Sequence, residues 1–505
     1  MTKTPQDQDD TGDGSPDGVE RASQPSLLVS ALPLLLLIAA LSYNVFVFGD
    51  DAVSGSNQLI LIGAAAIAAL LAIGQGLSWD RLQNGILDAI RLAAPAILIL
   101  LLVGALSGTW LISGIIPAMI YYGLQILSPE IFLPGACIIT ALVALFTGSS
   151  WTSVATIGIA LVGIGQVLGQ NEAAVAGAII SGAYFGDKMS PLSDTTNLAS
   201  AASNTELFAH VRYMALTTIP SITIAIVIFA LIGSGSADSG ATQRTEEISE
   251  VLRNTINLTP WLIAPPLIIV GLILKKVPAL PAILAGVLLG AVLAPIFQAD
   301  LLAKITNNSS YVSLMTVMYG DSAIVTGDAT LDELLTAGGM QGMLTTIWLI
   351  LAAMCFGGVM EASGFLRRIT DFLVSRARTD LGLVSATAGT CVFTNVTAAD
   401  QYLAVIVPGR MFANAYEERG LAPQNLSRTL EDAGTVTSPL VPWNTCGAFH
   451  AGVLGVSTLA YAPFAIFCYL SPIMTLAFMA FGIRIARIAT APDTKTVTTH
   501  LAMNR

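Results

Sequence analysis

Long apolar stretches separated by short polar loops make up most of this chain. Eight stretches are apolar enough to predict helices that cross a membrane, at 27–48, 57–76, 92–108, 211–233, 260–276, 279–297, 343–360 and 461–483. A spanning helix needs about 20 mostly apolar residues. Two further regions, 131–203 and 382–458, are apolar but are interrupted by polar residues and prolines. The pattern predicts an all-α polytopic membrane protein.

Composition agrees with a membrane location and excludes several classes of protein. Of the 505 residues, 54% are hydrophobic and 11% are charged, whereas soluble domains carry about 25% charged residues. This excludes an ordinary soluble enzyme, a disordered chain and a nucleic-acid binder with a basic face. The five cysteines stand singly, and no CxxC, HExxH, GxSxG or P-loop pattern occurs. We therefore expect no enzyme activity, no bound cofactor and no nucleic-acid partner.

Basic residues in the loops indicate the orientation, because Lys and Arg gather on the cytoplasmic side of a membrane. They occur in the segments 77–91, 275–278, 365–380, 410–429 and 485–505. The loops 49–56 and 320–333 carry acids without a base and belong on the extracellular side. The number of crossings before it places the polar linker 234–259 on that side as well. The sequence thus predicts a multi-pass protein of the cell (plasma) membrane with both termini in the cytoplasm. We expect the acidic N-terminal tail, 1–26, to be disordered.

Three short matches at nearly one spacing relate the two halves of the chain. SGTWLISG (107–114) matches GGVMEASG (357–364), FTG (146–148) matches FTN (393–395), and SPL occurs at 190–192 and at 438–440. The segments 92–108 and 343–360 are expected to cross in opposite directions. The same order with opposite direction predicts two inverted-topology repeats, 27–233 and 260–484, a plan found in many secondary transporters. The second repeat would include an extracellular loop, 298–342, and a cytoplasmic tail, 485–505, would follow it.

Each interrupted region divides into two parts. The stretches 131–169 and 382–414 have polar tips and are predicted to be re-entrant hairpins. The stretches 173–203 and 430–458 are predicted to be helices broken in the middle. This gives about 10–12 transmembrane segments. If the hairpins were pairs of full spans instead, every loop would stay on the same side of the membrane.

The stretch GDKMSPLSDTTN (186–197) holds the strongest chemical signal. Pro191 breaks a helix there and frees backbone groups at membrane depth. Freed carbonyls with carboxylate, hydroxyl and amide oxygens suit a hard cation such as Na⁺. The candidate ligands are Asp187, Ser190, Asp194, Thr195, Thr196 and Asn197. Lys188 could pair with Asp187 or Asp194 or act as a tethered cation, and a plain cytoplasmic loop is the alternative for the whole stretch.

The second broken region, EDAGTVTSPLVPWNTCG (431–447), offers a matching set. Pro439 and Pro442 interrupt the helix. The candidates around them are Thr435, Thr437, Ser438, Asn444 and Thr445. Glu431 and Asp432 lie about one turn earlier and could carry protons, or could be surface acids that begin the helix.

The predicted hairpin tips, TGSSWTS (147–153) and TNVTAADQY (394–402), add further polar groups. The candidates there are Gly148, Ser149, Ser150, Thr152, Asn395, Thr397 and Asp400. Small residues at these tips could instead allow tight helix packing. Asp400 is a functional candidate because acids are rare inside membrane segments. The expected Na⁺ ligands are Asp187, Asp194, Asn197, Asn395 and Asp400.

Six acids are candidates for proton coupling: Asp187, Asp194, Glu361, Asp400, Glu431 and Asp432. Glu361 ends a span and could equally be an interfacial acid. His210 precedes a span and is expected at the interface. His450 lies in the second broken region and could titrate near neutrality or make a structural hydrogen bond.

These stretches carry a resemblance to a known family. GDKMSPLSDTTNLA (186–199) is similar to the hallmark stretch of the NhaC family of Na⁺/H⁺ antiporters. Four more stretches resemble other patterns of this family: GTWLISGIIPAMIYYGL (108–124), MEASGFL (360–366), ADQYLAVIVPGRM (399–411) and LSRTLEDAGTVTSPLVPWNTCG (426–447). The resemblance covers about 92–484 and implies an ion-transporter fold with inverted repeats that exchanges Na⁺ for H⁺.

The family that the sequence resembles also includes exchangers of organic anions, such as malate for lactate with coupled Na⁺ and H⁺. The expected function is therefore Na⁺/H⁺ exchange by alternating access, with ion and proton competing for buried carboxylates. The alternative is a Na⁺-coupled transporter of organic anions or amino acids. The expected partners are the lipid bilayer, Na⁺ and H⁺, with a small organic anion and a second copy of the chain as further candidates.

Overall fold

The computed structural model describes residues 25–234, 241–306 and 310–488. Nearly all of the described chain is helical, as the sequence predicts, and the bilayer-length helices are rich in exposed apolar side chains. The predicted acidic tail, apart from residues 25 and 26, and the cytoplasmic tail beyond 488 lie outside the described residues. The fold is therefore that of an all-α membrane protein.

Eight described helices are long and apolar enough to cross a membrane. They are α1 (Leu27–Phe48), α2 (Ser56–Ile73), α3 (Trp79–Ile112), α5 (Pro129–Thr147), the continuous helix Ser150–Val167, α10 (Leu207–Ser234), α13 (Ala279–Phe297) and Gly339–Ala362, which ends in α18 (Leu344–Ala362). Two bent helix pairs raise the number to ten if each counts as one span. These helices account for six of the eight predicted spans.

The two remaining predicted spans belong to the two bent helix pairs. Just before the first, 260–276, α11 (Ala241–Thr255) meets at 102° the segment that runs from Pro260 to the end of α12 (Ala264–Leu274). Across the second, α24 (Thr458–Tyr461) and its following turn meet α25 (Ile466–Ala480) at 54°. Prolines at the bends, Pro260 and Pro463, lack the N–H that would continue a helix. The predicted span 260–276 is thus unbroken over 260–274, whereas 461–483 contains a bend of 54° near its start.

Both predicted hairpins are helix pairs joined at a short break. The first is α5 followed by α6 (Ser150–Ser153), a π-helical turn (Val154–Gly158) and α7 (Ile159–Val167). The second is α20 (Asp380–Thr397) followed by α21 (Gln401–Glu418). Both arms of the first hairpin have the length and apolarity of full spans, so full crossings remain an alternative to re-entry.

The two predicted broken helices are also present. The first is α8 (Glu172–Met189) followed by α9 (Asp194–Ala202). The second runs through α22 (Pro423–Leu430), a π-helical turn (Glu431–Thr435) and a 3-10 turn (Ser438–Leu440) to α23 (Thr445–Leu454). Each break lies at the Ser-Pro-Leu sequence that the two halves share.

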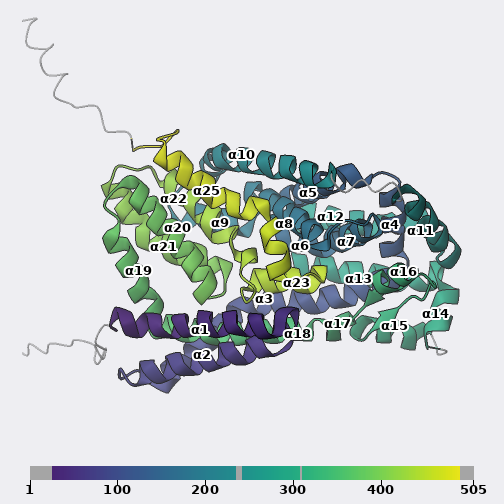
Figure 1. Cartoon of the computed structure of the whole chain (residues 1–505), viewed down its shortest axis with the longest axis horizontal. Coiled ribbons are helices and arrows are strands. Elements are labelled where there is room, and N and C mark those ends of the chain that lie inside the picture. The colour runs from purple at the N-terminus through teal and green to yellow at the C-terminus, as the bar shows by residue number, and fades with distance from the viewer. Residues whose placement is uncertain (1–24, 235–240, 307–309, 489–505) are drawn as a thin grey trace, which may run out of the picture.

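The helices are arranged in layers (Figure 1). The helices α1, α2, α3 and α18 lie along one long edge, and α10 lies along the opposite edge against α5 and α25. α19 (Phe365–Arg376) and α20–α22 fill one end, and the other end holds α4 (Ile115–Leu124), α11 and the 298–342 stretch. The broken helices lie between these layers.

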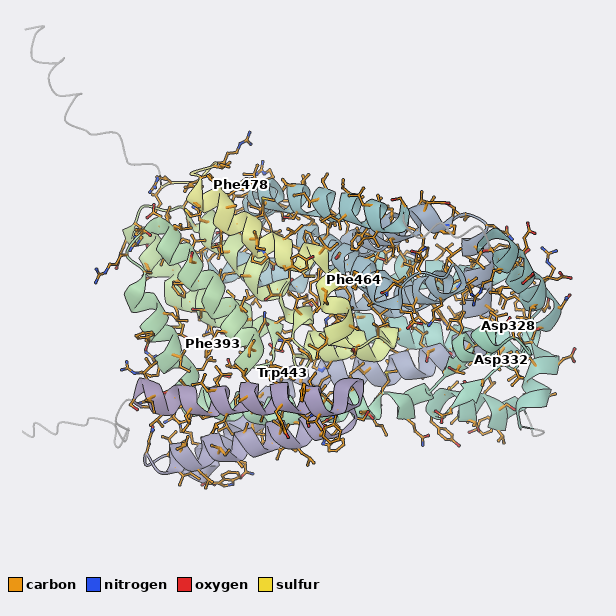
Figure 2. The ribbon with its side chains drawn as sticks, viewed as in Figure 1. Asp328, Asp332, Phe393, Trp443, Phe464 and Phe478 are labelled. Carbon is orange, nitrogen blue, oxygen red and sulfur yellow. The ribbon has the colours of Figure 1, made fainter. Side chains whose placement is uncertain are left out.

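The stretch 298–342, expected as an extracellular loop, is largely folded. It contains α14 (Ala299–Thr306), α15 (Ser310–Tyr319), α16 (Ala329–Leu334), α17 (Gly339–Gly342) and the antiparallel strands β1 (Ser322–Ala323) and β2 (Thr336–Ala337), with Ser322 opposite Ala337. Figure 2 shows Asp328 and Asp332 at this end of the molecule. A backbone hydrogen bond from Thr326 holds the pKa of the Asp332 carboxyl below its ordinary value.

Close glycine contacts bring α8 to the first hairpin. A Cβ atom at Gly182 would collide with the carbonyl oxygen of Cys137, and one at Gly186 with that of Ala141. Glycines spaced four apart allow helix backbones to approach each other in this way. The contact sets the last turn of α8, which carries Asp187, beside the tip of the hairpin.

Candidate functional site

Four helix N-termini, two from each half of the chain, converge beside the breaks. Their N-cap residues are Ser149 of α6, Ser193 of α9, Asp400 of α21 and Asn444 of α23, and each side chain accepts a hydrogen bond from a backbone N–H of its own helix. Such caps satisfy N–H groups that have no partner within the helix. The polar residues found at the interruptions thus begin new helices.

The tips of the two hairpins have the same backbone course. At the first tip, Gly148 adopts a left-handed conformation (φ +67°) before the extended Ser149. At the second, Ala399 (φ +56°) precedes the extended Asp400. The Ala399 carbonyl accepts a hydrogen bond from the Thr445 N–H at 2.9 Å, which ties the second tip to α23.

A cavity of about 410 Å³ lies where these tips and breaks meet. It brings together seven of the residues predicted from the sequence: Gly148, Ser149, Asp187, Asp194, Thr195, Asp400 and Thr445. One wall is entirely apolar and comes from α3 (Leu92 to Ile99) and from Pro278 to Leu280 at the start of α13. The polar lining comes from the hairpins and the broken helices.

All three carboxylates of the cavity lie at helix N-termini. Asp187 is buried, and its Oδ2 accepts a hydrogen bond at 3.0 Å from the N–H of Ser150, the first residue of α6. Asp194 is exposed and begins α9. Asp400 is buried and caps α21, where it accepts hydrogen bonds from the N–H groups of Tyr402 and Leu403 at 2.9 and 3.0 Å. The positive end of each helix favours the ionised carboxylate.

The other predicted residues of the first break shape the chain around the cavity. The Thr196 hydroxyl donates to the Lys188 carbonyl at 2.9 Å. The Asn197 amide donates to the carbonyls of Pro191 and Ser193. The Ser190 hydroxyl accepts a hydrogen bond from the Leu192 N–H at 3.2 Å. These contacts satisfy backbone groups that the proline break exposes.

The second break has a comparable network centred on Asn395. Its amide nitrogen donates to the Gly434 carbonyl at 2.6 Å and to the Thr437 hydroxyl at 3.0 Å. Asn444 donates in turn to the side-chain and backbone oxygens of Asn395, both at 3.1 Å. The predicted residues Thr152, Thr397 and Ser438 donate to Ser149 Oγ, the Phe393 carbonyl and the Thr435 carbonyl, respectively.

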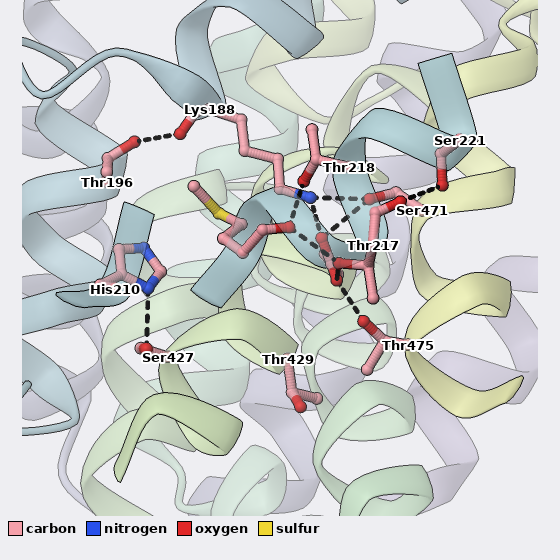
Figure 3. Close-up of polar contacts among 12 residues, drawn as sticks. Lys188, Thr196, His210, Thr217, Thr218, Ser221, Ser427, Thr429, Ser471 and Thr475 are labelled. Atoms are coloured by element: carbon pink, nitrogen blue, oxygen red, sulfur yellow. Dashed lines mark hydrogen bonds and ion pairs between the residues drawn. The ribbon is translucent and has the colours of Figure 1, made fainter. Parts of the chain in front are cut away.

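Lys188 forms an ion pair with Asp432, so it pairs with neither of the aspartates considered from the sequence. Both side chains are completely buried. Asp432 also accepts hydrogen bonds from the hydroxyls of Ser471 (2.8 Å), Thr217 (3.0 Å) and Thr475. Figure 3 shows these groups converging from α8, α10 and α25. Of the roles left open by the sequence, pairing with Asp187 or Asp194 does not occur, because the last turn of α8 points the lysine away from the cavity and toward Asp432.

Glu431 has surroundings unlike those of its neighbour Asp432. It is also completely buried, but its carboxylate oxygens make no hydrogen bond with the described residues. Asp187 and Lys188 are the charged groups near it, and the hydroxyls of Thr435 and Thr195 also face it. Two adjacent acids of the π-helical turn are thus held very differently: Asp432 accepts a full set of hydrogen bonds, whereas Glu431 has only the Thr435 and Thr195 hydroxyls as nearby donors among the described residues.

Glu361 and the two histidines lie outside the cavity lining. Glu361 is exposed at the end of α18 and lines a separate cavity with Arg81 and Asp88. His210, expected at the interface, is buried and lies 2.7 Å from the Ser427 hydroxyl. His450 makes a structural hydrogen bond with the Tyr184 hydroxyl at 3.2 Å.

Sequence reasoning missed several contributors. Trp151, Ser193, Gln401 and Tyr402 line the cavity, and all four lie inside or beside the stretches already singled out. The hydroxyls of Thr217, Ser471 and Thr475 lie in apolar helices with no charged residue next to them in the sequence, and they gave no signal. Over the described residues, no three His, Cys, Asp or Glu side chains come close enough to hold a metal ion by themselves. A cation here would therefore need hydroxyl or carbonyl oxygens as well.

The model of the Na⁺/H⁺ antiporter family matches residues 182–483, which include the break of the first broken helix, the second hairpin and the whole second broken helix. The chain belongs to this family. The Na⁺/H⁺ antiporter NhaC of Alkalihalophilus pseudofirmus is 37% identical over 85% of this chain and 90% of that protein. The resemblance to the NhaC family is confirmed. Its relatives are transporters rather than enzymes.

Two other relatives carry different names. The malate-2H⁺/Na⁺-lactate antiporter of Bacillus subtilis is 37% identical over 85% of this chain and 88% of that protein. The arginine/ornithine antiporter ArcD of Halobacterium salinarum is 35% identical over 90% of this chain and 91% of that protein. Relatives of this chain are thus named for several different substrates.

Proposed function

We propose that this protein exchanges Na⁺ for H⁺ across the plasma membrane, with the two ions competing for the cavity carboxylates Asp187 and Asp194. The observation that carries this proposal is the placement of three aspartates on one cavity, each at a helix N-terminus. The acids give a bound cation its counter-charge. A carboxylate that holds a proton attracts Na⁺ far less, so competition for one site couples the two fluxes.

The oxygen atoms around the cavity suit Na⁺ in number and kind. Carboxylates of Asp187, Asp194 and Asp400 and hydroxyls of Ser149, Thr195 and Thr445 supply hard oxygen ligands. Asn197 and Asn395 do not line the cavity, and the Asn395 side-chain oxygen already accepts a hydrogen bond from Asn444, so we assign both a supporting role. The proposal needs no cofactor.

The two unlike walls of the cavity support alternating access. Every ionisable lining group lies on the hairpins and broken helices, whereas α3 and α13 present only apolar side chains. An apolar wall makes no ion contacts that would be lost if the polar side slid or rocked against it. With the orientation inferred from basic loops, the cytoplasmic halves of α3 and α13 form that wall, and the cavity faces the cytoplasm.

Transport of a small organic solute together with Na⁺ is the second candidate function. The cavity volume of about 410 Å³ favours it, because small-molecule pockets measure about 300–1,000 Å³. The names of two relatives are in keeping with this alternative.

Asp194→Asn tests the proposal. In inside-out vesicles with a pH-sensitive dye and no organic solute, we expect the wild type to show Na⁺-induced proton movement and the variant to show none. Glu417→Gln, the same chemical change at an exposed position on α21, serves as the control. Wild-type rates in Asp194→Asn would contradict the assignment of this carboxylate.

A further inference from the structure

We infer that the cavity also accepts a small organic cation, an alkylammonium or guanidinium ion, in place of Na⁺. The inference rests on the proposed function, because it assigns a second substrate class to the same site. It follows from the size, the charge and the aromatic lining of the cavity, taken together.

The cavity is larger than a bare ion needs. At about 410 Å³ it falls within the range of small-molecule pockets. Its wall of α3 and α13 side chains, from Leu92 to Ile99 and from Pro278 to Leu280, is apolar. A surface of this kind contributes nothing to Na⁺ binding but favours the carbon atoms of an organic substrate.

The charge of the lining selects a cation. Three aspartates contribute to it, and none of the lining residues, all within the described part of the chain, is a lysine, arginine or histidine. The nearby Lys188 is completely buried against Asp432. An organic anion would therefore meet carboxylates without a basic side chain to balance them.

The helix N-termini do not reverse this preference. Free N-termini would bind a substrate carboxylate. Here, however, Asp187 occupies the first N–H of α6, and Asp400 accepts the N–H groups of Tyr402 and Leu403 in the first turn of α21. The chain's own carboxylates thus take the positions that an anionic substrate would need, which argues against a malate- or lactate-like substrate.

Two aromatic side chains supply the remaining feature. Trp151 and Tyr402 both line the cavity, on the first and second hairpin respectively. The Trp151 ring stacks on Phe449 with centroids 4.2 Å apart, which holds the ring in place. Aromatic faces attract guanidinium and ammonium groups in desolvated sites, and planar guanidinium also pairs with carboxylates through two hydrogen bonds.

The test uses the full-length protein in proteoliposomes with an imposed pH gradient. We expect radiolabelled guanidinium to be taken up in exchange for H⁺ and to compete with Na⁺, whereas lactate and malate do neither. Tyr402→Leu should weaken guanidinium binding roughly three- to tenfold more than Na⁺ binding. Tyr43→Leu, at an exposed position on α1, should change neither.

The outcomes separate the two proposals. Na⁺/H⁺ exchange without guanidinium uptake or competition would overturn the organic-cation assignment and leave the proposed function intact. Uptake of malate or lactate in preference to guanidinium would also overturn it. Guanidinium/H⁺ exchange without Na⁺/H⁺ exchange would contradict the proposed function and support the present inference.

Discussion

Lys188 and Asp432 form a buried ion pair although they lie 244 residues apart in the chain. Lys188 belongs to the first broken helix and Asp432 to the π-helical turn of the second. Hydroxyls from α10 and α25 complete the surroundings of the carboxylate. The pair therefore fastens the two broken helices to each other behind the cavity that holds Asp187.

Loss of charge at the two adjacent acids of that turn, Glu431 and Asp432, should affect stability to different extents. Asp432→Asn leaves a buried ammonium without its partner, and breaking a buried pair in this way costs about 3–5 kcal/mol. Glu431→Gln removes a carboxylate whose oxygens make no hydrogen bond with the described residues, so we expect little loss of stability. Thermal unfolding in detergent, followed by size-exclusion chromatography, would compare them. Equal melting temperatures would contradict the assigned role of the ion pair.

Gly148 should tolerate no side chain. Its φ of +67° is unfavourable for other residues by about 1–2 kcal/mol. A Cβ there would also lie 2.8 Å from the backbone carbon of Leu192, so Gly148→Ala must push the hairpin tip away from the first break. We expect a lower melting temperature and slower Na⁺/H⁺ exchange. Gly389→Ala is the control, because a Cβ at that helical position meets no described atom within 4 Å. Equal melting temperatures and equal exchange rates for the two variants would contradict a role for the close contact between Gly148 and the first break.

Asn395→Ala should destabilise the second break. The substitution removes two donated hydrogen bonds and leaves Asn444 without a side-chain acceptor. Unsatisfied buried polar groups cost about 1–3 kcal/mol each. Asn414→Ala, on the exposed face of α21, should change stability by less than about 0.5 kcal/mol. Urea unfolding of both variants would measure the difference, and an unchanged midpoint for Asn395→Ala would refute the structural role.

Much of this architecture could be predicted from the sequence because the relevant signals are local. Apolar stretches of bilayer length mark the helices, and Pro191 and Pro439 mark the breaks. Gly148 could be recognised as a tip residue, since glycine readily takes a left-handed conformation. Ala399 takes the same conformation without any signal in its residue type, so the likeness of the two tips became visible only in the backbone.

Other features depend on packing between distant segments. The partner of Lys188 could not be found from spacing, because the aspartates nearest in sequence project toward the cavity and Asp432 comes from the other half of the chain. The hydroxyl of Ser471 stands alone in an apolar helix and gains meaning only beside that pair. The opposite membrane directions of the two halves stay a prediction.

The most direct test of competition between Na⁺ and H⁺ is the apparent KM for Na⁺ measured against pH in proteoliposomes. If one proton excludes Na⁺ from the cavity carboxylates, the apparent KM should rise by up to about tenfold for each unit that pH falls, with an unchanged maximum rate. An apparent KM that stays constant across pH while the maximum rate falls would contradict a shared site.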